Sequence, residues 1–269
     1  MVIPKTVTTI YQAAFQKNIN LKSVIFEERI EPLLMRWSIW AYCTSLVEIN
    51  LPDTSILESN SGAFFDGCTS LEKVHMSESF NMLGDYFFRN CTSLKEVNIP
   101  TNITKIGRGA FQKAGIESIV LPSKSGITID SGAFDQCPNL TSIDIPRNYD
   151  IGLASGLFSS CEALVEATIG EGITAIPSSC FNRCIALKKV TLPSTVTIIY
   201  SNAFFNDYSM EILMVKSVVP PTVEGDSFGY NFSKQCKIYV PDTSVDMYKE
   251  DSWWGQYSNR MYALSLLNE

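Results

Sequence analysis

Apolar and polar residues alternate in short stretches that recur along the chain. Three segments share the frame F-x-x-C-x-x-L-x-x-(I/V)-x-(I/L)-P, namely residues 88–100 (FRNCTSLKEVNIP), 134–146 (FDQCPNLTSIDIP) and 181–193 (FNRCIALKKVTLP). The last two apolar positions of the frame flank a polar one, which is the pattern of a β-strand with one buried face. The proline that follows lacks the N–H that a sheet requires, so it ends the strand. Each copy of the frame therefore predicts one short strand.

The aromatic position of this frame recurs at nearly constant spacing. From the first member to the ninth, successive differences are 25, 25, 23, 23, 23, 24, 23 and 23 residues. The members are Phe15, Trp40, Phe65, Phe88, Phe111, Phe134, Phe158, Phe181 and Phe204, followed by Phe228. The leucine position agrees, with Leu21, Leu46, Leu71, Leu94, Ile116, Leu140, Leu164, Leu187 and Met210. Before each aromatic residue stands a second motif that usually ends in Ala-Phe, as in residues 102–111 (NITKIGRGAF).

A repeat of about 23 residues predicts a solenoid of about ten turns, because one turn cannot bury its apolar face without a neighbour. The strands are expected to form one parallel sheet on the concave side, with short helical turns at the Ala-Phe motif on the convex side. Equivalent residues such as Val97, Ile119 and Ile143 would then stack about 4.8 Å apart, which makes ten turns about 45–50 Å long. A sandwich of short strands would also alternate, but it would not keep a fixed register over several columns.

The two ends of the chain differ in pattern. Residues 1–234 are predicted to form the solenoid, and residues 235–269 the last strand and a C-terminal cap. Residues 3–15 (IPKTVTTIYQAAF) match residues 192–204 (LPSTVTIIYSNAF), so the chain opens in mid-repeat. We expect upstream sequence with an export signal, and a first turn that leaves apolar side chains such as Leu21, Val24 and Phe26 poorly covered. Such an end would fray or associate with a second copy.

The recurring C-x-x-L-x-x-I-x-I-P string and the Ala-Phe motif closely resemble the BspA-like branch of leucine-rich-repeat proteins. These proteins occur on the surface of gut and oral anaerobic bacteria and of some protists. The resemblance covers nearly the whole chain, and the tail from Cys236 through Tyr248, Trp253, Trp254 and Tyr262 is similar to the family's C-terminal cap. It implies a strand-dominated α/β-type leucine-rich-repeat solenoid that binds or adheres at a cell surface. It brings no catalytic residues.

Composition narrows the function further. The 269 residues are 45% hydrophobic and carry a formal net charge of −7. This balance disfavours nucleic-acid binding, which depends on Lys and Arg neutralising phosphates, and gives no attraction to an anionic membrane. The apolar runs are shorter than the ~20 residues of a membrane span. No cofactor motif, such as a glycine-rich phosphate loop, is present.

Six of the eight cysteines share one position of the repeat. They are Cys43, Cys68, Cys91, Cys137, Cys161 and Cys184. Either they form disulfides or a metal-binding row, or they are small buried side chains. Ala114 in the same column favours the second interpretation, and so does the parallel direction of side chains in neighbouring turns, which suits bridging poorly. We therefore expect reduced, structural thiols and no metal site.

Two further features allow two interpretations each. His75, the only histidine, is expected at an outward strand position, either contacting a ligand or belonging to a solvated surface. Residues 29–40 (RIEPLLMRWSIW) are the least regular stretch. There, Trp40 belongs to the aromatic column. Trp37, with Leu33, Leu34 and Met35, either covers the neighbouring turn or forms an exposed apolar interaction patch.

Any ligand face on the sheet is expected to use two outward columns. The first column holds Glu48, Lys73, Glu96, Ser118, Ser142, Glu166 and Lys189. The second holds Asn50, His75, Asn98, Val120, Asp144, Thr168 and Thr191, and ends in Met214 and Tyr239. The first half is richest in charges and amides, so the candidate binding residues are Glu48, Asn50, Lys73, His75, Glu96 and Asn98. The alternative is a solvated sheet face without a ligand.

Three classes of function are compared with these features of the sequence. The favoured one is a non-catalytic binding or adhesion module that recognises a protein or glycan at a cell surface. The second is a structural spacer within a longer surface protein, which would have a featureless sheet face. The third is an enzyme, which nothing in the sequence supports, although a fold alone never excludes a grafted site.

Overall fold

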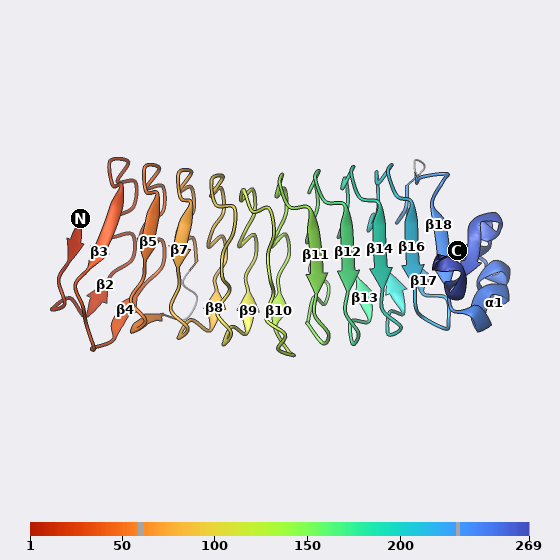
Figure 1. The fold of residues 1–269 in the computed structure, drawn as a ribbon, viewed down its shortest axis with the longest axis horizontal. Coiled ribbons are helices and arrows are strands. Elements are labelled where there is room, and N and C mark those ends of the chain that lie inside the picture. The colour runs from red at the N-terminus through yellow and green to blue at the C-terminus, as the bar shows by residue number, and fades with distance from the viewer. Residues whose placement is uncertain (59–61, 230–231, 269) are drawn as a thin grey trace.

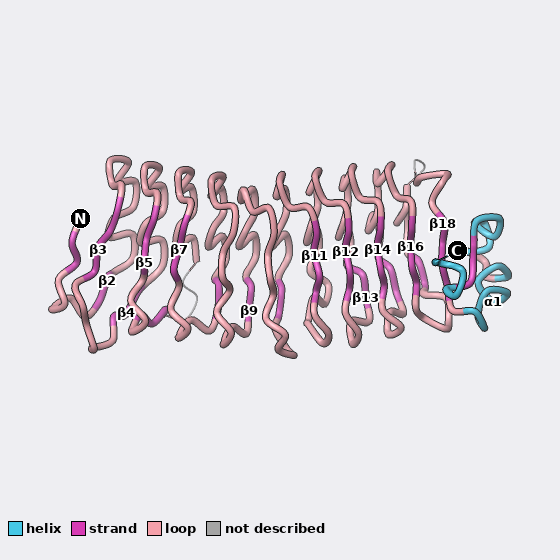
Figure 2. Tube along the Cα trace, viewed as in Figure 1, coloured by secondary structure: helices cyan, strands magenta, loops and turns pink. Residues whose placement is uncertain are grey.

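The repeats stack side by side in a row. The computed structural model describes residues 1–58, 62–229 and 232–268, and about eleven turns follow one another from the N-terminal end to a helical C-terminal end (Figure 1). Most turns contribute a strand to one side of the stack and a second short strand to another side. Most of the remaining chain is turn and loop (Figure 2). The predicted strand-dominated solenoid is confirmed.

The frame strands form the first ladder, in which all pairs are parallel. It consists of two sheets separated along the stack. The N-terminal sheet contains β1 (Val2–Ile3), β3 (Ser23–Phe26), β5 (Glu48–Asn50) and β7 (Lys73–His75). The C-terminal sheet contains β11 (Ser142–Ile145), β12 (Glu166–Ile169), β14 (Lys189–Leu192), β16 (Ile212–Val215), β18 (Lys237–Val240) and β19 (Met261–Ala263).

A second ladder, which the sequence did not predict, runs along another side of the stack. Its strands come from the segment before each Ala-Phe motif and form three parallel sheets of three strands. The first contains β2 (Thr9–Ile10), β4 (Leu33–Met35) and β6 (Ser55–Leu57). The others contain β8 (Met82–Leu83), β9 (Lys105–Ile106) and β10 (Thr128–Ile129), then β13 (Ala175–Ile176), β15 (Ile198–Ile199) and β17 (Thr222–Val223).

The prediction of one continuous sheet is wrong at the centre of the stack. The segments around Val97 and Ile119 are not strands, so the first ladder is interrupted between β7 and β11. The turn there is shorter, because Ile116 follows Phe111 by five positions where the leucine position of neighbouring repeats follows by six. It passes so close to the preceding turn that a Cβ on Gly115 would lie 2.0 Å from the carbonyl oxygen of Thr92. We attribute the break in the first ladder to this shorter turn, because it shifts the position at which the following strand would begin.

The second ladder holds the stack together where the first is broken. Strands β8, β9 and β10 pair across the turns that lack first-ladder strands. Beyond β10, an isolated bridge between Thr128 and Asp150 and the pairing of β11 with β12 continue the connection. Each of these neighbouring turns is therefore joined to the next by backbone hydrogen bonds on at least one side.

The aromatic column forms the centre of the core, as predicted. From Trp40 to Phe228 its members are stacked with ring centroids 5.1–5.5 Å apart. Phe111 and Phe134 are nearly parallel, with an interplanar angle of 2° and centroids 5.3 Å apart. Such offset stacks add to the stabilisation from burial, by about 0.5–1.5 kcal/mol per pair.

The Ala-Phe motif forms an extended turn rather than the expected helical turn. Around Phe88, the flanking residues Tyr86 and Asn90 have φ of 60° and 59°. An α-helix needs consecutive right-handed residues, so this alternation prevents one. The N–H groups of Tyr86, Phe88 and Asn90 instead donate to carbonyl oxygens of the next turn, at 2.8, 2.6 and 2.9 Å. This recurs along the stack, with left-handed residues two positions before and after Phe111, Phe134 and Phe181.

All eight cysteines are free and buried, which agrees with the structural interpretation. The column has a common hydrogen bond, because each thiol donates to the carbonyl oxygen of the aromatic residue one turn earlier. In the centre, Cys91 bonds to Phe65 at 3.2 Å, and Cys161 to Phe134 at 3.1 Å. Burial raises the pKa of Cys91, Cys137 and Cys184 well above the ordinary value for a thiol. These sulfurs are therefore uncharged and unreactive.

Helices occur only at the C-terminal end of the described chain. They are η1 (Asp242–Ser244), α1 (Val245–Glu250), η2 (Trp254–Arg260) and η3 (Leu264–Asn268). Trp254 and Tyr248 are fully buried there, and Trp254 Nε1 donates to Pro221 O at 2.8 Å. At the other end, Leu21 and Val24 are buried, contrary to the prediction, because the first strand and its following segment cover them.

Candidate functional site

Strand alternation in β5 and β7 places four of the six predicted binding residues on the outward face of the first ladder. Glu48, Asn50, Lys73, His75, Glu96 and Asn98 are all exposed. The register of β5 with β7 sets Glu48 beside Lys73 and Asn50 beside His75. Glu96 and Asn98 belong to the next turn, which has no first-ladder strand. The structure therefore brings the first four together directly and leaves the last two across the break.

Local contacts within this group are weak. Asn50 Nδ2 donates to Glu48 Oε1 at 3.4 Å, and His75 Nε2 lies 3.2 Å from Asp53 Oδ1. The side chains of His75 and Asp53 are 60% and 83% exposed, so water screens this pair. Exposed pairs of this kind contribute about 0–1 kcal/mol, which leaves the side chains available to a ligand.

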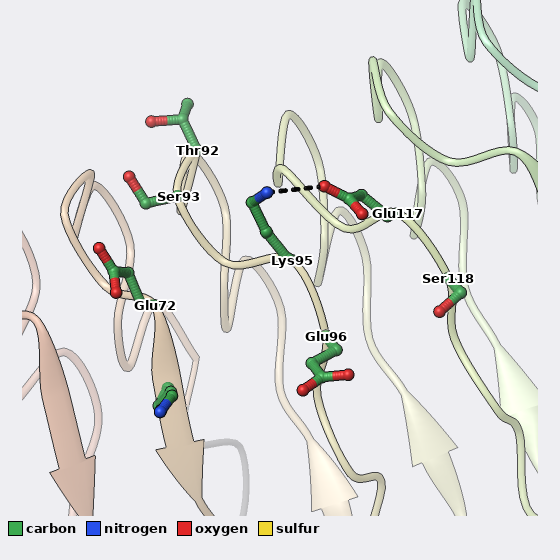
Figure 3. Close-up of a pocket in the computed structure, with 8 residues that line it drawn as sticks. Glu72, Thr92, Ser93, Lys95, Glu96, Glu117 and Ser118 are labelled. Carbon is green, nitrogen blue, oxygen red and sulfur yellow. Dashed lines mark ion pairs between the residues drawn. The ribbon is translucent and has the colours of Figure 1, made fainter.

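A shallow hollow of about 630 Å³ lies at the break in the first ladder. Its lining residues are Glu72, Lys73, Thr92, Ser93, Lys95, Glu96, Glu117 and Ser118. Of the six predicted residues, Lys73 and Glu96 belong to it, and the other four do not. Figure 3 shows Glu72, Ser93 and Lys95 arranged around its upper part, with Lys95 Nζ 3.0 Å from Glu117 Oε1.

A third outward column, which the strand pattern did not predict, supplies much of this hollow. Glu72, Lys95 and Glu117 each follow directly after a member of the leucine column. They stand before the strand positions that alternate, so the strand pattern did not select them. Their signal was the run of charged residues at one fixed repeat position.

The charged residues of the first outward column are paired at one end of the molecule and unpaired at the hollow. Lys189 Nζ lies 2.7 Å from Glu166 Oε1 in the C-terminal sheet. Among the described residues, neither Lys73 nor Glu96 takes part in an ion pair, although they occupy the same column. Within this column, Lys73 and Glu96 at the hollow are therefore open to a ligand, whereas Glu166 and Lys189 are not.

Toward the C-terminus the outward face of the first ladder is covered by other residues of the chain. The second column was predicted to end in exposed Met214 and Tyr239, but these side chains are only 7% and 6% exposed. Strand β19 extends the sheet next to β18, η3 packs beside both, and the rings of Tyr239 and Tyr262 are 5.7 Å apart. The chain's last residues thus cover this end of the face.

Residues 29–40 were predicted either to cover the neighbouring turn or to form an exposed apolar patch, and each interpretation describes part of the segment. Leu33 and Met35 are fully buried in β4. Trp37 is 49% exposed, so it does not simply cover the neighbouring turn.

The groups at the hollow suit hydrogen bonding and ion pairing. In the described part of the chain, no group of three or more His, Cys, Asp or Glu side chains is arranged to hold a metal ion. Across the same residues, no helix has the length and apolar character to cross a bilayer.

Comparison with known families gives the repeat its identity. A family described as "BspA type Leucine rich repeat region" matches residues 36–126 and 109–233, with six copies. The chain belongs to this family. The resemblance found in the repeat frame is confirmed, and the BspA-type fold indicates a protein-interaction module that is typically non-enzymatic.

Solved structures of bacterial leucine-rich-repeat proteins share the fold. One is a leucine-rich repeat protein from Bacteroides ovatus, with 18% identity and a TM-score of 0.57, covering 98% of this chain and 83% of that one. Another is the pneumococcal vaccine antigen PcpA, with 15% identity and a TM-score of 0.56, covering 97% and 76%. No curated protein matches the sequence.

Proposed function

We propose that this BspA-type chain is a non-catalytic adhesion module of a bacterial cell surface. It recognises a protein or glycan partner through the outward face of the N-terminal half of the first ladder. The observation that carries the proposal is the hollow at the break, where Lys73 and Glu96 are exposed and unpaired while Glu166 and Lys189, in the same column, pair with each other. Unpaired charges have not exchanged their hydration for an internal partner, so a ligand can engage them.

The extracellular location is part of the same proposal. It rests on the family and on the fold shared with PcpA, a pneumococcal vaccine antigen. Protease treatment of intact cells tests it, with a cytoplasmic protein as the control. Cleavage of this chain while the control stays intact supports a surface location.

The binding role is tested with immobilised extracellular-matrix proteins and a glycan array. The wild-type chain is compared with a variant that carries alanine at Glu48, Asn50, Lys73, His75, Glu96 and Asn98. A matched control carries Glu166→Ala and Lys189→Ala, which removes two charges of the same column away from the hollow. We expect the six-residue variant to lose binding and the control to keep it. Equal binding by all three proteins would remove this face from consideration.

A structural spacer is the second candidate, favoured by the charges that pair between turns. Lys188 Nζ lies 3.0 Å from Glu211 Oε1, and Glu166 pairs with Lys189. The charged groups on this part of the face therefore already have ion-pair partners within the chain. A spacer would bind no member of the panel, and its loss would affect only the position of the domains it separates.

A further inference from the structure

A second hollow, of about 370 Å³, lies between the last repeat and the C-terminal helices. It is remote from the outward face at Lys73 and Glu96, near the opposite end of the stack. Its lining residues are Gly225, Asp226, Phe228, Gly229, Phe232, Lys234, Trp253, Gln256, Tyr257 and Arg260. Small-molecule sites commonly have volumes of this order, apolar walls and a few convergent polar groups.

Four aromatic rings form the walls of this cap hollow. Phe228 ends the aromatic column, and Trp253 takes the next place at 5.2 Å with a tilt of 40° instead of a parallel stack. Tyr257 lies 5.5 Å from Trp253 and 5.8 Å from Phe232. Phe228 and Phe232 are buried, whereas Trp253 and Tyr257 are half-buried. Part of each of the last two rings is thus open to solvent at the hollow.

Polar groups of both kinds surround the rings. Asp226, Lys234 and Gln256 are exposed, and the amide nitrogen of Gln256 donates to Trp253 O at 2.8 Å, which leaves its oxygen as an acceptor. The Arg260 guanidinium carbon lies 4.6 Å from the Tyr257 ring centroid, so the guanidinium is held against the aromatic wall. The rim therefore offers two acceptors and two cationic donors.

We propose that the cap hollow binds a saccharide of one or two rings. The apolar C–H face of a sugar packs against an exposed aromatic ring, and its hydroxyl groups both donate and accept hydrogen bonds. Trp253 and Tyr257 supply the ring surfaces, and Asp226, Gln256 and Lys234 supply partners of both kinds. A simple anion would leave the exposed ring surfaces of Trp253 and Tyr257 uncovered, and an extended peptide would exceed a hollow of this size.

The test uses methyl β-galactoside, methyl β-N-acetylglucosaminide, methyl glucuronide, maltose and cellobiose. Each is titrated against the full chain by calorimetry and by tryptophan fluorescence, since Trp253 lines the hollow and reports its occupation. The double variant Asp226→Ala with Gln256→Ala changes two exposed rim side chains and none of the four rings, and circular dichroism checks that its fold is intact. We expect at least one probe to bind the wild type, and the double variant to bind it about tenfold more weakly or worse.

The control carries Asp246→Ala and Lys249→Ala, two exposed residues of α1 that do not line the hollow. It should bind the same probe as the wild type does. The variant Trp253→Phe should abolish most of the fluorescence change, whereas Trp37→Phe, at the far end of the stack, should not. N-acetylphenylalanine amide is titrated as a peptide-like probe. The proposal is overturned if no saccharide binds, if the rim variant binds the saccharide equally well, or if this amide alone binds. Loss of partner binding at Lys73 and Glu96 leaves this test unaffected.

Discussion

Cys184 donates its backbone N–H to the Asp207 carboxylate at 2.9 Å, inside the cysteine column. Asp207 occupies the position that Cys184 holds one turn earlier, and it is fully buried. Its Oδ2 has no hydrogen-bond partner among the described residues. Burial raises the pKa of this carboxyl group well above its ordinary value, and the bond from Cys184 offsets only part of that effect.

The first prediction is that Asp207→Cys stabilises the protein at neutral and alkaline pH. The folded state keeps the carboxyl group protonated, so stability is fully present below the unfolded pKa of about 4 and falls as the pH rises toward the raised folded value. A thiol at position 207, as in the rest of the column, removes this loss. The free energy of unfolding should then rise by about 1–3 kcal/mol at pH 8. Denaturant unfolding at pH 4 and pH 8 measures the change, with exposed Asp144→Asn as the control. An equal gain in the free energy of unfolding at both pH values would show that ionisation of Asp207 is not the cause.

The second prediction concerns the thiols. Under denaturing, non-reducing conditions, titration with a thiol reagent should count eight free groups, and the folded protein should expose nearly none of them. Ala114→Cys should add a ninth buried thiol with little change in stability, because its neighbours in the column hold the same side chain. Finding disulfides in the freshly purified protein would overturn the structural role of the column.

The third prediction tests the explanation for the break in the first ladder. Gly115→Ala places a methyl group against Thr92 O and should cost about 1–3 kcal/mol, with faster hydrogen exchange around residues 92–98. Gly126→Ala is the matched control, because a Cβ there meets nothing within 4 Å and only its left-handed φ of 77° opposes the change. Exchange that changes equally in both variants would show that the close approach is not responsible.

How much of the molecule the sequence predicts depends on the kind of contact involved. The aromatic and leucine columns were predictable because stacking requires the same residue type at a fixed spacing. The break was not, although Phe111 and Ile116 are visibly one residue closer than their counterparts. Its consequence depends on the approach of Gly115 to Thr92, which is a tertiary contact.

The candidate site shows the same division. Alternation along β5 and β7 predicted that Glu48, Lys73 and His75 face outward. It did not predict the hollow, which needs Lys95 and Glu117 from positions outside the alternating pattern. Nor did it predict that Met214 and Tyr239 are covered, because that depends on how the last residues fold back over β18.

The fourth prediction concerns a buried ion pair between turns. Arg89 Nε and Nη2 bind Asp66 Oδ1 and Oδ2 at 2.9 and 2.5 Å, and Asp66 is only 2% exposed. Arg89→Ala removes the cation and leaves that buried carboxylate with only the long hydrogen bond from Asn90 Nδ2, at 3.4 Å, so it should cost about 3 kcal/mol. Removing both side chains should cost less than the sum of the single changes, which thermal or denaturant unfolding of the four proteins measures. Additive effects would mean that the pair is not coupled.

The hollow at Lys73 and Glu96 is the proposed contact with the partner. The most direct measurement is the binding rate and affinity of Lys73→Glu and Glu96→Lys, singly and together, for the matrix protein or glycan that the wild type binds best. Each single charge reversal should weaken binding about tenfold or more. The control, Glu166→Lys with Lys189→Glu, should bind like the wild type. Unchanged affinity in both single variants, with the fold intact by circular dichroism, would show that the partner does not bind at this hollow.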